Sequence, residues 1–81
     1  METNTWQEAN NSLTKTFSFA DFDSAWLFMT KVASLAKELD HHPKWTNLYN
    51  QVSFELSTHS AGEVTDLDRR LAEGIDRLAQ G

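Results

Sequence analysis

The stretch that decides the fold is DFDSAWLFMTKVASLAKEL, at residues 21–39. Its apolar residues recur at three- and four-residue spacing, which is the period of an amphipathic helix. Asp21 stands just before them and is a good N-cap, because its carboxylate can accept a hydrogen bond from a first-turn amide. We therefore predict a helix over residues 22–39. Its buried stripe is expected to consist of Phe22, Ala25, Trp26, Met29, Val32, Ala33, Ala36 and Leu39.

Phe28 and Leu35 lie off this stripe and give the helix a second apolar face. Such a face is a candidate contact between subunits. A chain of 81 residues buries only about 60–65% of its unfolded surface. Self-association would add stability, so we expect a homo-oligomer.

An alternating segment precedes the helix. Residues 13–19 place apolar side chains on one face and threonine and serine on the other, which predicts a half-buried strand. Lys15 falls on the apolar face, so burial there is expected to be incomplete, or the lysine stem to snorkel toward water. A weaker strand is expected at residues 5–9, followed by a tight turn at Asn10-Asn11, since Asn tolerates a positive φ.

Two more strands and a second helix follow the central helix. Residues 45–49 are expected to form one strand, with a turn at Asn50, and residues 51–58 alternate strictly and predict another. Thr65 is expected to cap the last helix, whose first turn carries acids that the helix dipole favours. The buried stripe of this helix is expected to consist of Leu67, Leu71, Ile75 and Leu78.

The order of elements is therefore β-β-α-β-β-α. Two helices that each carry an apolar stripe would cover one face of a four-stranded, mostly antiparallel sheet, which is an α+β fold. The other face carries serine, threonine and glutamate, and it is expected to stay wet or to meet a partner. We expect residues 1–81 to form a single domain.

The composition argues against several classes of protein. The chain has no cysteine, which rules out disulfides and thiolate metal sites and fits a reducing cytoplasm. A net charge of −5 with scattered Lys and Arg argues against nucleic-acid binding, which normally shows a basic patch. No apolar run of about 18 residues is present to span a membrane, and the N-terminus does not resemble a signal peptide. The expected partner is a small molecule or another protein.

The three histidines are the candidate chemical groups. His41 and His42 are adjacent after the predicted central helix, and His59 closes an alternating strand. They could simply occupy polar loops. A zinc site would need all three, with Asp40 or Asp68 as a fourth ligand, and its spacing is poor because neighbouring side chains diverge. Two histidines could instead flank a substrate as acid and base, because imidazole exchanges protons near neutral pH.

Three further side chains could assist such a site. Asp68 could orient a histidine or bind a polar edge of the substrate, although an acid in a first helical turn needs no such role. Trp6 and Trp45 could stack on a flat heterocycle, although most tryptophans in so small a chain lie in the core. The residues alone leave these alternatives open.

Residues 13–79 closely resemble the pterin-4a-carbinolamine dehydratases, a family also known as dimerization cofactors of a homeodomain transcription factor. The longest matching stretches are FSFADF at 17–22, FMTKVA at 28–33 and LDHHPKW at 39–45. The spaced signature of the family comprises an ionisable residue, a His-His-Pro motif, an aromatic residue, a histidine and an acid. This chain meets that signature with Lys37, His41-His42-Pro43, Tyr49, His59 and Asp68.

The resemblance implies dehydration of 4a-hydroxytetrahydrobiopterin (pterin-4a-carbinolamine) to quinonoid dihydropterin and water, in support of tetrahydrobiopterin recycling. It implies no metal and no organic cofactor. His41, His42 and His59 would form the catalytic site, with His59 and His41 in proton transfer and His42 mainly binding and orienting the pterin.

The resemblance also implies binding residues and an assembly. Asp40 and Asp68 match supporting acids around the pterin, Trp6 matches a tryptophan near the pocket, and Trp45 is a further candidate for stacking. Family members form homodimers and commonly homotetramers. Longer members begin with an additional helix, which this chain is expected to lack. Other members bind a transcription factor, so the alternative function is a non-catalytic protein-binding or dimer-stabilising module.

Overall fold

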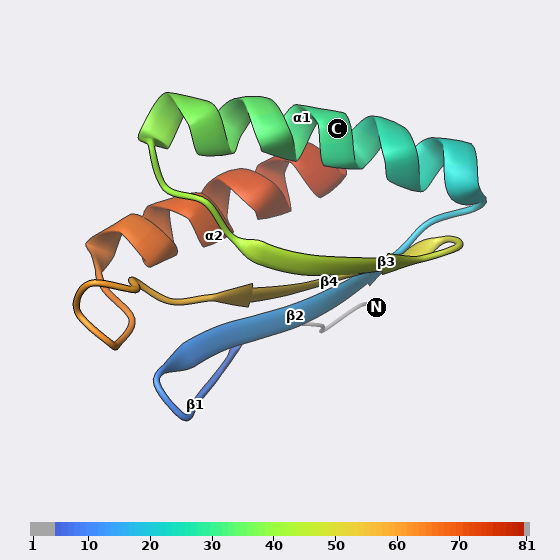
Figure 1. Cartoon of the computed structure of the whole chain (residues 1–81). Helices are drawn as coiled ribbons and strands as arrows, with labels where there is room; N and C mark the ends of the chain where they lie inside the picture. The colour runs from blue at the N-terminus through green and yellow to red at the C-terminus, as the bar shows by residue number, and fades with distance from the viewer. Residues whose placement is uncertain (1–4, 81) are drawn as a thin grey trace.

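The computed structural model describes residues 5–80. Figure 1 shows two helices lying over one face of a sheet. The elements in chain order are β1 (Gln7–Ala9), β2 (Ser12–Ser18), α1 (Phe22–Leu39), β3 (Lys44–Leu48), β4 (Gln51–Leu56) and α2 (Asp66–Gln80). The predicted order β-β-α-β-β-α is confirmed.

The sheet has the order β1-β2-β4-β3, and each neighbouring pair of strands is antiparallel. Leu13 pairs with Leu56 across the two central strands, so these apolar side chains share the face that the helices cover. The predicted α+β class is therefore confirmed. The expected absence of the family's N-terminal helix concerns the segment ahead of β1, of which residues 1–4 lie outside the described part of the chain.

The helix α1 has the predicted bounds, whereas the strand ends differ from the prediction by one or two residues. Asp21 caps the helix as expected, because its carboxylate accepts a hydrogen bond of 2.9 Å from the Ser24 amide. That bond and a hydrogen bond from the Ser24 side chain lower the pKa of Asp21, against a smaller opposing effect of burial. The strand β4 ends at Leu56, two residues before the predicted end, because the chain then enters a turn.

Two tight turns depend on positive φ angles. Asn10 and Asn11 have φ of 53° and 62°, the left-handed pair that a two-residue hairpin favours, so the predicted turn is confirmed. At the β3–β4 turn the positive φ, 52°, belongs to Tyr49. The next residue, Asn50, exchanges bonds of 2.9 and 2.7 Å with the backbone of Phe19. The hairpin tip is thereby joined to the β2–α1 loop.

The buried face of α1 differs from the predicted stripe. Phe28, predicted to lie off the stripe, is only 4% exposed and packs against Phe17 and Phe54. Trp26, predicted to be buried, is 57% exposed. The prediction was wrong here because apolar residues surround the first half of this helix, and spacing alone does not say which of them meet the sheet. Phe22 and Ala33, also predicted to be buried, are exposed, and the large apolar residues that α1 leaves exposed are Phe22, Trp26 and Leu27.

The helix α2 packs against α1 at a glycine. A Cβ at Gly74 would lie 2.4 Å from Leu35 Cδ2, so Leu35 fills the space over the bare backbone. Leu71 and Ile75 are buried as predicted, but Leu67 at the N-terminal end is 37% exposed. No helix within residues 5–80 combines the length and apolarity that crossing a bilayer requires.

The burial of Lys15 is incomplete, as expected, and its side chain is 10% exposed. Its ammonium lies 2.8 Å from Asp76 Oδ1 on α2 and 4.8 Å from the centre of the Phe17 ring. The Trp6 indole donates a second hydrogen bond, of 3.1 Å, to the same carboxylate oxygen. A carboxylate on the covering helix therefore compensates the lysine on the apolar face.

Truncation of the two aromatic residues tests the corrected helix face. Phe28→Ala should lower the free energy of unfolding by about 3–5 kcal/mol, because it leaves a cavity in the core. Trp26→Ala should lower it by less than about 1 kcal/mol, because the ring is mostly in water. Urea unfolding of dilute protein measures both values. Equal losses in the two variants would contradict the described packing.

Candidate functional site

The end of α1 places His41. Asp40 has a left-handed φ of 52°, and its amide donates to the Lys37 carbonyl at 3.2 Å. The His41 amide donates to the Ala36 carbonyl at 3.0 Å. These two bonds form a Schellman-type ending, which satisfies the last carbonyls of the helix and reverses the chain. The side chain of His41, which follows this chain reversal, is 12% exposed.

A short turn after β4 places the backbone around His59. The Thr58 amide donates to the Glu63 carbonyl at 2.9 Å, and the Gly62 amide donates back to the Thr58 carbonyl at 2.8 Å. Gly62 allows this closure because its φ is 68°, in the left-handed region. His59 is exposed within the turn, one residue from Thr58.

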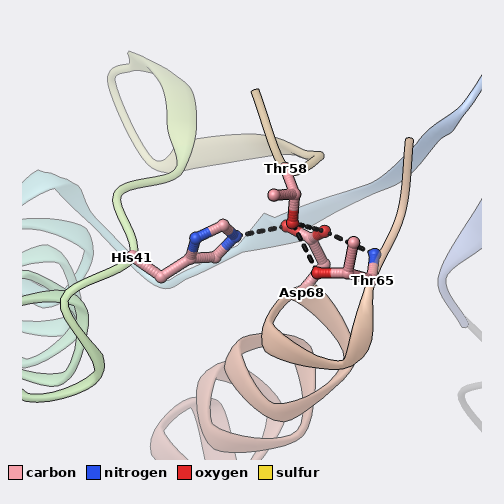
Figure 2. A network of polar contacts seen from close by, with 4 residues as sticks. All are labelled: His41, Thr58, Thr65 and Asp68. Atoms are coloured by element: carbon pink, nitrogen blue, oxygen red, sulfur yellow. Dashed lines mark hydrogen bonds and ion pairs between the residues drawn. The ribbon is translucent and has the colours of Figure 1, made fainter. Parts of the chain in front are cut away.

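Asp68, in the first turn of α2, is the centre of a polar network (Figure 2). Its side chain is completely buried. Oδ1 lies 2.6 Å from His41 Nε2, and Oδ2 accepts from the Thr58 hydroxyl at 2.8 Å and from the Thr65 amide at 2.9 Å. The carboxylate thus joins the end of α1, the end of β4 and the start of α2.

These contacts keep the carboxylate ionised. Burial by itself raises the pKa of Asp68, but the bonds from His41, the Thr65 amide and the Thr58 hydroxyl outweigh burial, and the pKa is lowered. An ionised carboxylate accepts hydrogen bonds and donates none. The hydrogen between the two residues therefore belongs to His41 Nε2, and Nδ1 is the nitrogen left to exchange a proton with another group.

The family model described as pterin 4 alpha carbinolamine dehydratase matches residues 1–78. The chain belongs to this family. A relative from Prochlorococcus marinus is 49% identical over 74 residues, which cover 91% of this chain and 77% of the relative. Another, from Paraburkholderia xenovorans, is 49% identical over 75 residues, with 90% and 78% covered. The names of both relatives assign them provisionally as pterin-4-alpha-carbinolamine dehydratases.

Solved structures show the same fold. A protein from Brucella melitensis described as a transcriptional coactivator/pterin dehydratase has a TM-score of 0.89 and 42% identity, with 91% of this chain and 81% of that chain covered. A pterin dehydratase-like protein described as a RuBisCO assembly factor in the alpha-carboxysome has a TM-score of 0.78 and 23% identity, with 96% and 90% covered. The second likeness concerns the fold alone.

The structure of this family member brings together some of the predicted site residues. His41 and Asp68 are in contact, and the backbone of His59 is held near them because Thr58 bonds to the same carboxylate. His42 is exposed next to His41. Asp40 is exposed, and it is the residue with a left-handed φ at the end of α1.

The two predicted stacking residues, Trp6 and Trp45, pack against the hydrophobic core. Trp6 bonds to Asp76, which lies two turns along α2 from Asp68, about 12 Å by helix rise. Trp45 packs edge-on against Phe54, with ring centres 5.4 Å apart. Both tryptophans are half-buried. The structure therefore does not bring them to the His41–Asp68 contact.

Sequence reasoning missed the role of two threonines. The sequence pattern predicts Thr58 as the last residue of a strand and Thr65 as the cap of the last helix. In the structure the Thr65 hydroxyl instead meets the Thr58 hydroxyl at 2.5 Å, and Asp68 accepts from the Thr65 amide. The spacing Thr65-x-x-Asp68 is that of a capping box, and it was the available signal.

Two other kinds of site find less support. Within residues 5–80, no group of three or more His, Cys, Asp or Glu side chains is arranged to hold a metal ion. A hollow of about 410 Å³ lies on the sheet, where Thr14, Thr46 and Ser53 contribute hydroxyls. Its charged residues include Lys44 and Glu55, which pair with each other at 3.7 Å. It includes none of the histidines.

The lowered pKa of Asp68 predicts a pH dependence of stability. The folded pKa lies below the unfolded value, about 3.9, so the contribution of the carboxylate is full above that value and is lost as the pH falls through the folded pKa. Asp68→Asn should lower the free energy of unfolding by about 1–3 kcal/mol at neutral pH. It should then lose less stability than the wild type between about pH 5 and pH 3, measured by urea unfolding.

Asp66→Asn is the matched control, because Asp66 is in the same helical turn but exposed. That variant should keep the wild-type dependence on pH. If Asp68→Asn also keeps it, the carboxylate is not held in the folded state as described.

Proposed function

We propose that this protein dehydrates 4a-hydroxytetrahydrobiopterin to quinonoid dihydropterin and water, and so supports tetrahydrobiopterin recycling. Membership of the family supports a pterin dehydratase. The observation that carries the proposal is the contact between His41 and the buried Asp68. This contact occupies Nε2 of His41 and leaves Nδ1 to exchange a proton with a substrate. Such a pairing is how proteins prepare an imidazole for proton transfer.

The reaction needs two proton movements. One group protonates the departing 4a-hydroxyl, which leaves as water, and another removes the proton from N5, so that a C=N bond forms between N5 and C4a. The N5 lone pair drives the departure of the hydroxyl. We assign the two proton transfers to His41 and His59. General acid–base catalysis of this kind typically raises a reaction rate by about 10²–10⁴-fold. No metal or organic cofactor takes part in this scheme.

The remaining predicted residues are proposed to bind the substrate. His42 and Asp40 are exposed beside His41, and we propose that they bind and orient the pterin. Asp68 acts through His41, which its carboxylate contacts directly. Trp6 and Trp45 are half-buried and lie apart from the His41–Asp68 contact, so we propose that the exposed part of either ring meets the pterin away from its reacting C4a and N5 atoms.

Removal of the two imidazoles tests the proposal. His41→Ala and His59→Ala should each lower the dehydration rate by about 100-fold or more, since each would remove one proton-transfer group. The measurement is stopped-flow dehydration of freshly generated 4a-hydroxytetrahydropterin, with circular dichroism to verify folding. Ser60→Ala, a change of an exposed residue in the same turn as His59, is the control and should keep the wild-type rate.

Two outcomes would contradict the proposal. One is a wild-type protein that does not accelerate the reaction above its spontaneous rate. The other is a folded His59→Ala variant with near-normal turnover, which would exclude His59 from proton transfer.

We further propose that residues 1–81 work as a single domain in the cytoplasm, as a homodimer or homotetramer. The predicted second face, Phe28 and Leu35, does not serve as the contact we expected, because Phe28 is in the core. Support for a homo-oligomer comes instead from the exposed apolar residues of α1. The rings of Phe22 and Trp26 are stacked there, with their centres 6.2 Å apart. An exposed aromatic cluster is a usual place for association.

The same cluster supports a second candidate function, a protein-binding module. One structural neighbour, 42% identical, is described as a transcriptional coactivator/pterin dehydratase. The histidine variants distinguish the two functions in vivo. Loss of function in His41→Ala and His59→Ala favours the enzyme, and retention favours the binding module.

A charge in the exposed cluster tests the assembly. Trp26→Lys should shift the sedimentation coefficient toward that of a 9.2 kDa monomer, because a lysine in an apolar contact is costly to desolvate. Ser60→Lys, at an exposed position in the turn after β4 and away from α1, is the control and should leave the sedimentation coefficient unchanged. A wild-type protein that sediments as a monomer would exclude the homo-oligomer.

A further inference from the structure

Two threonines take part in the polar network without a role in the proposed reaction. The Thr58 hydroxyl lies 2.8 Å from Asp68 Oδ2 and 2.5 Å from the Thr65 hydroxyl. Figure 2 shows the two threonine side chains beside the carboxylate, with His41 reaching it from the other side. Within residues 5–80, no buried side-chain nitrogen or oxygen is without a hydrogen-bond partner. The network is therefore fully paired.

The direction of each hydrogen bond follows from chemistry. The Asp68 carboxylate is ionised and accepts only, so the Thr58 hydroxyl donates to it. A hydroxyl has one hydrogen, so the Thr58 oxygen must accept from the Thr65 hydroxyl. The chain of donors runs from Thr65 to Thr58 to Asp68.

As a result, the two carboxylate oxygens of Asp68 have different hydrogen-bond partners. Oδ2 is held by the Thr58 hydroxyl and the Thr65 amide, which leaves Oδ1 for His41. The torsion that turns a carboxylate is broad, so the bonds to Oδ2 set the plane that His41 Nε2 meets. Thr58 is also the residue before His59, and β4 has already ended at Leu56. Its bond to Asp68 therefore anchors the segment that carries His59.

We propose that Thr58 is a positioning residue that holds His41 and His59 to one buried carboxylate. The inference rests on the proposed function in that these two histidines move the protons. Its structural content is separate: the Thr58 hydroxyl orients Asp68, Asp68 fixes the His41 tautomer, and the same bond fixes the start of the turn that contains His59.

Removal of the hydroxyl is the test. Thr58→Val keeps the shape of the side chain, and it should lower kcat for dehydration by about 10- to 100-fold, the loss expected for a bond to a charged group. Thr58→Ser restores a hydroxyl and should return kcat to within about threefold of the wild type. Thr65→Val should lower kcat less than Thr58→Val does, because Thr58 still donates to Asp68. Thr46→Val, at an exposed position on β3, is the control.

A spectroscopic measurement separates this inference from the proposed function. ¹⁵N NMR of the imidazoles should show one His41 tautomer, with hydrogen on Nε2, in the wild type and in Thr58→Ser. Thr58→Val should show a mixture of tautomers. The tautomers can be compared even if the wild-type protein does not dehydrate the pterin. That failure would contradict the proposed function but not the role of Thr58.

Three results would overturn the inference. They are a Thr58→Val variant with the wild-type tautomer, a Thr58→Ser variant as slow as Thr58→Val, or equal losses in Thr58→Val and Thr65→Val. Thr58→Ala removes the same hydroxyl without placing a methyl group against the carboxylate, and it takes the place of Thr58→Val if the latter does not fold.

Discussion

The buried carboxylate of Asp68 is the constraint on which the site depends. Its side chain is completely buried, and a buried carboxylate needs hydrogen-bond partners. Those partners come from the ends of three elements that are separated in sequence, at His41, Thr58 and Thr65. An unpaired charge in this position would be costly. The carboxylate therefore fixes how the end of α1, the end of β4 and the start of α2 meet.

The two ends of α1 have different surroundings. Its first turns leave an aromatic cluster in water, and the nearby hairpin tip is tied to the start of the helix through Asn50 and Phe19. Its last turn leads into the network at Asp68, about 27 Å away by helix rise. Figure 1 shows these two ends on opposite sides of the molecule. Association at one end and proton transfer at the other would therefore not compete for surface.

The sequence predicted the elements better than it predicted their faces. The bounds of α1 were predictable because Asp21 caps one end and a chain reversal with Pro43 follows the other. Its buried face was not, because apolar residues occur all round the first turns and the choice between Trp26 and Phe28 depends on the sheet. The partner of Lys15 was not predictable either, since its compensating carboxylate is 61 residues away in sequence.

The candidate site was predictable in part. A resemblance to a known family identified the histidines and Asp68, whereas spacing alone left a loop, a zinc site and an acid–base pair open. The contact between His41 and Asp68 depends on the tertiary fold, and no local pattern indicates it. Thr58 was missed because a threonine at the end of a strand is common, and only the position of a buried acid gives its hydroxyl a role.

The position of Asp68 in the first turn of α2 links the site to local dynamics. Helix ends open more readily than helix interiors, and such openings occur without unfolding the whole domain. Each opening of this turn would withdraw the carboxylate from His41 and release the segment at Thr58 together. The fraction of molecules with an assembled site is therefore set by the fraying equilibrium of one helical turn. Hydrogen exchange at the amides of Thr65, Asp68 and Arg69, whose hydrogen bonds this opening would break, reports that equilibrium.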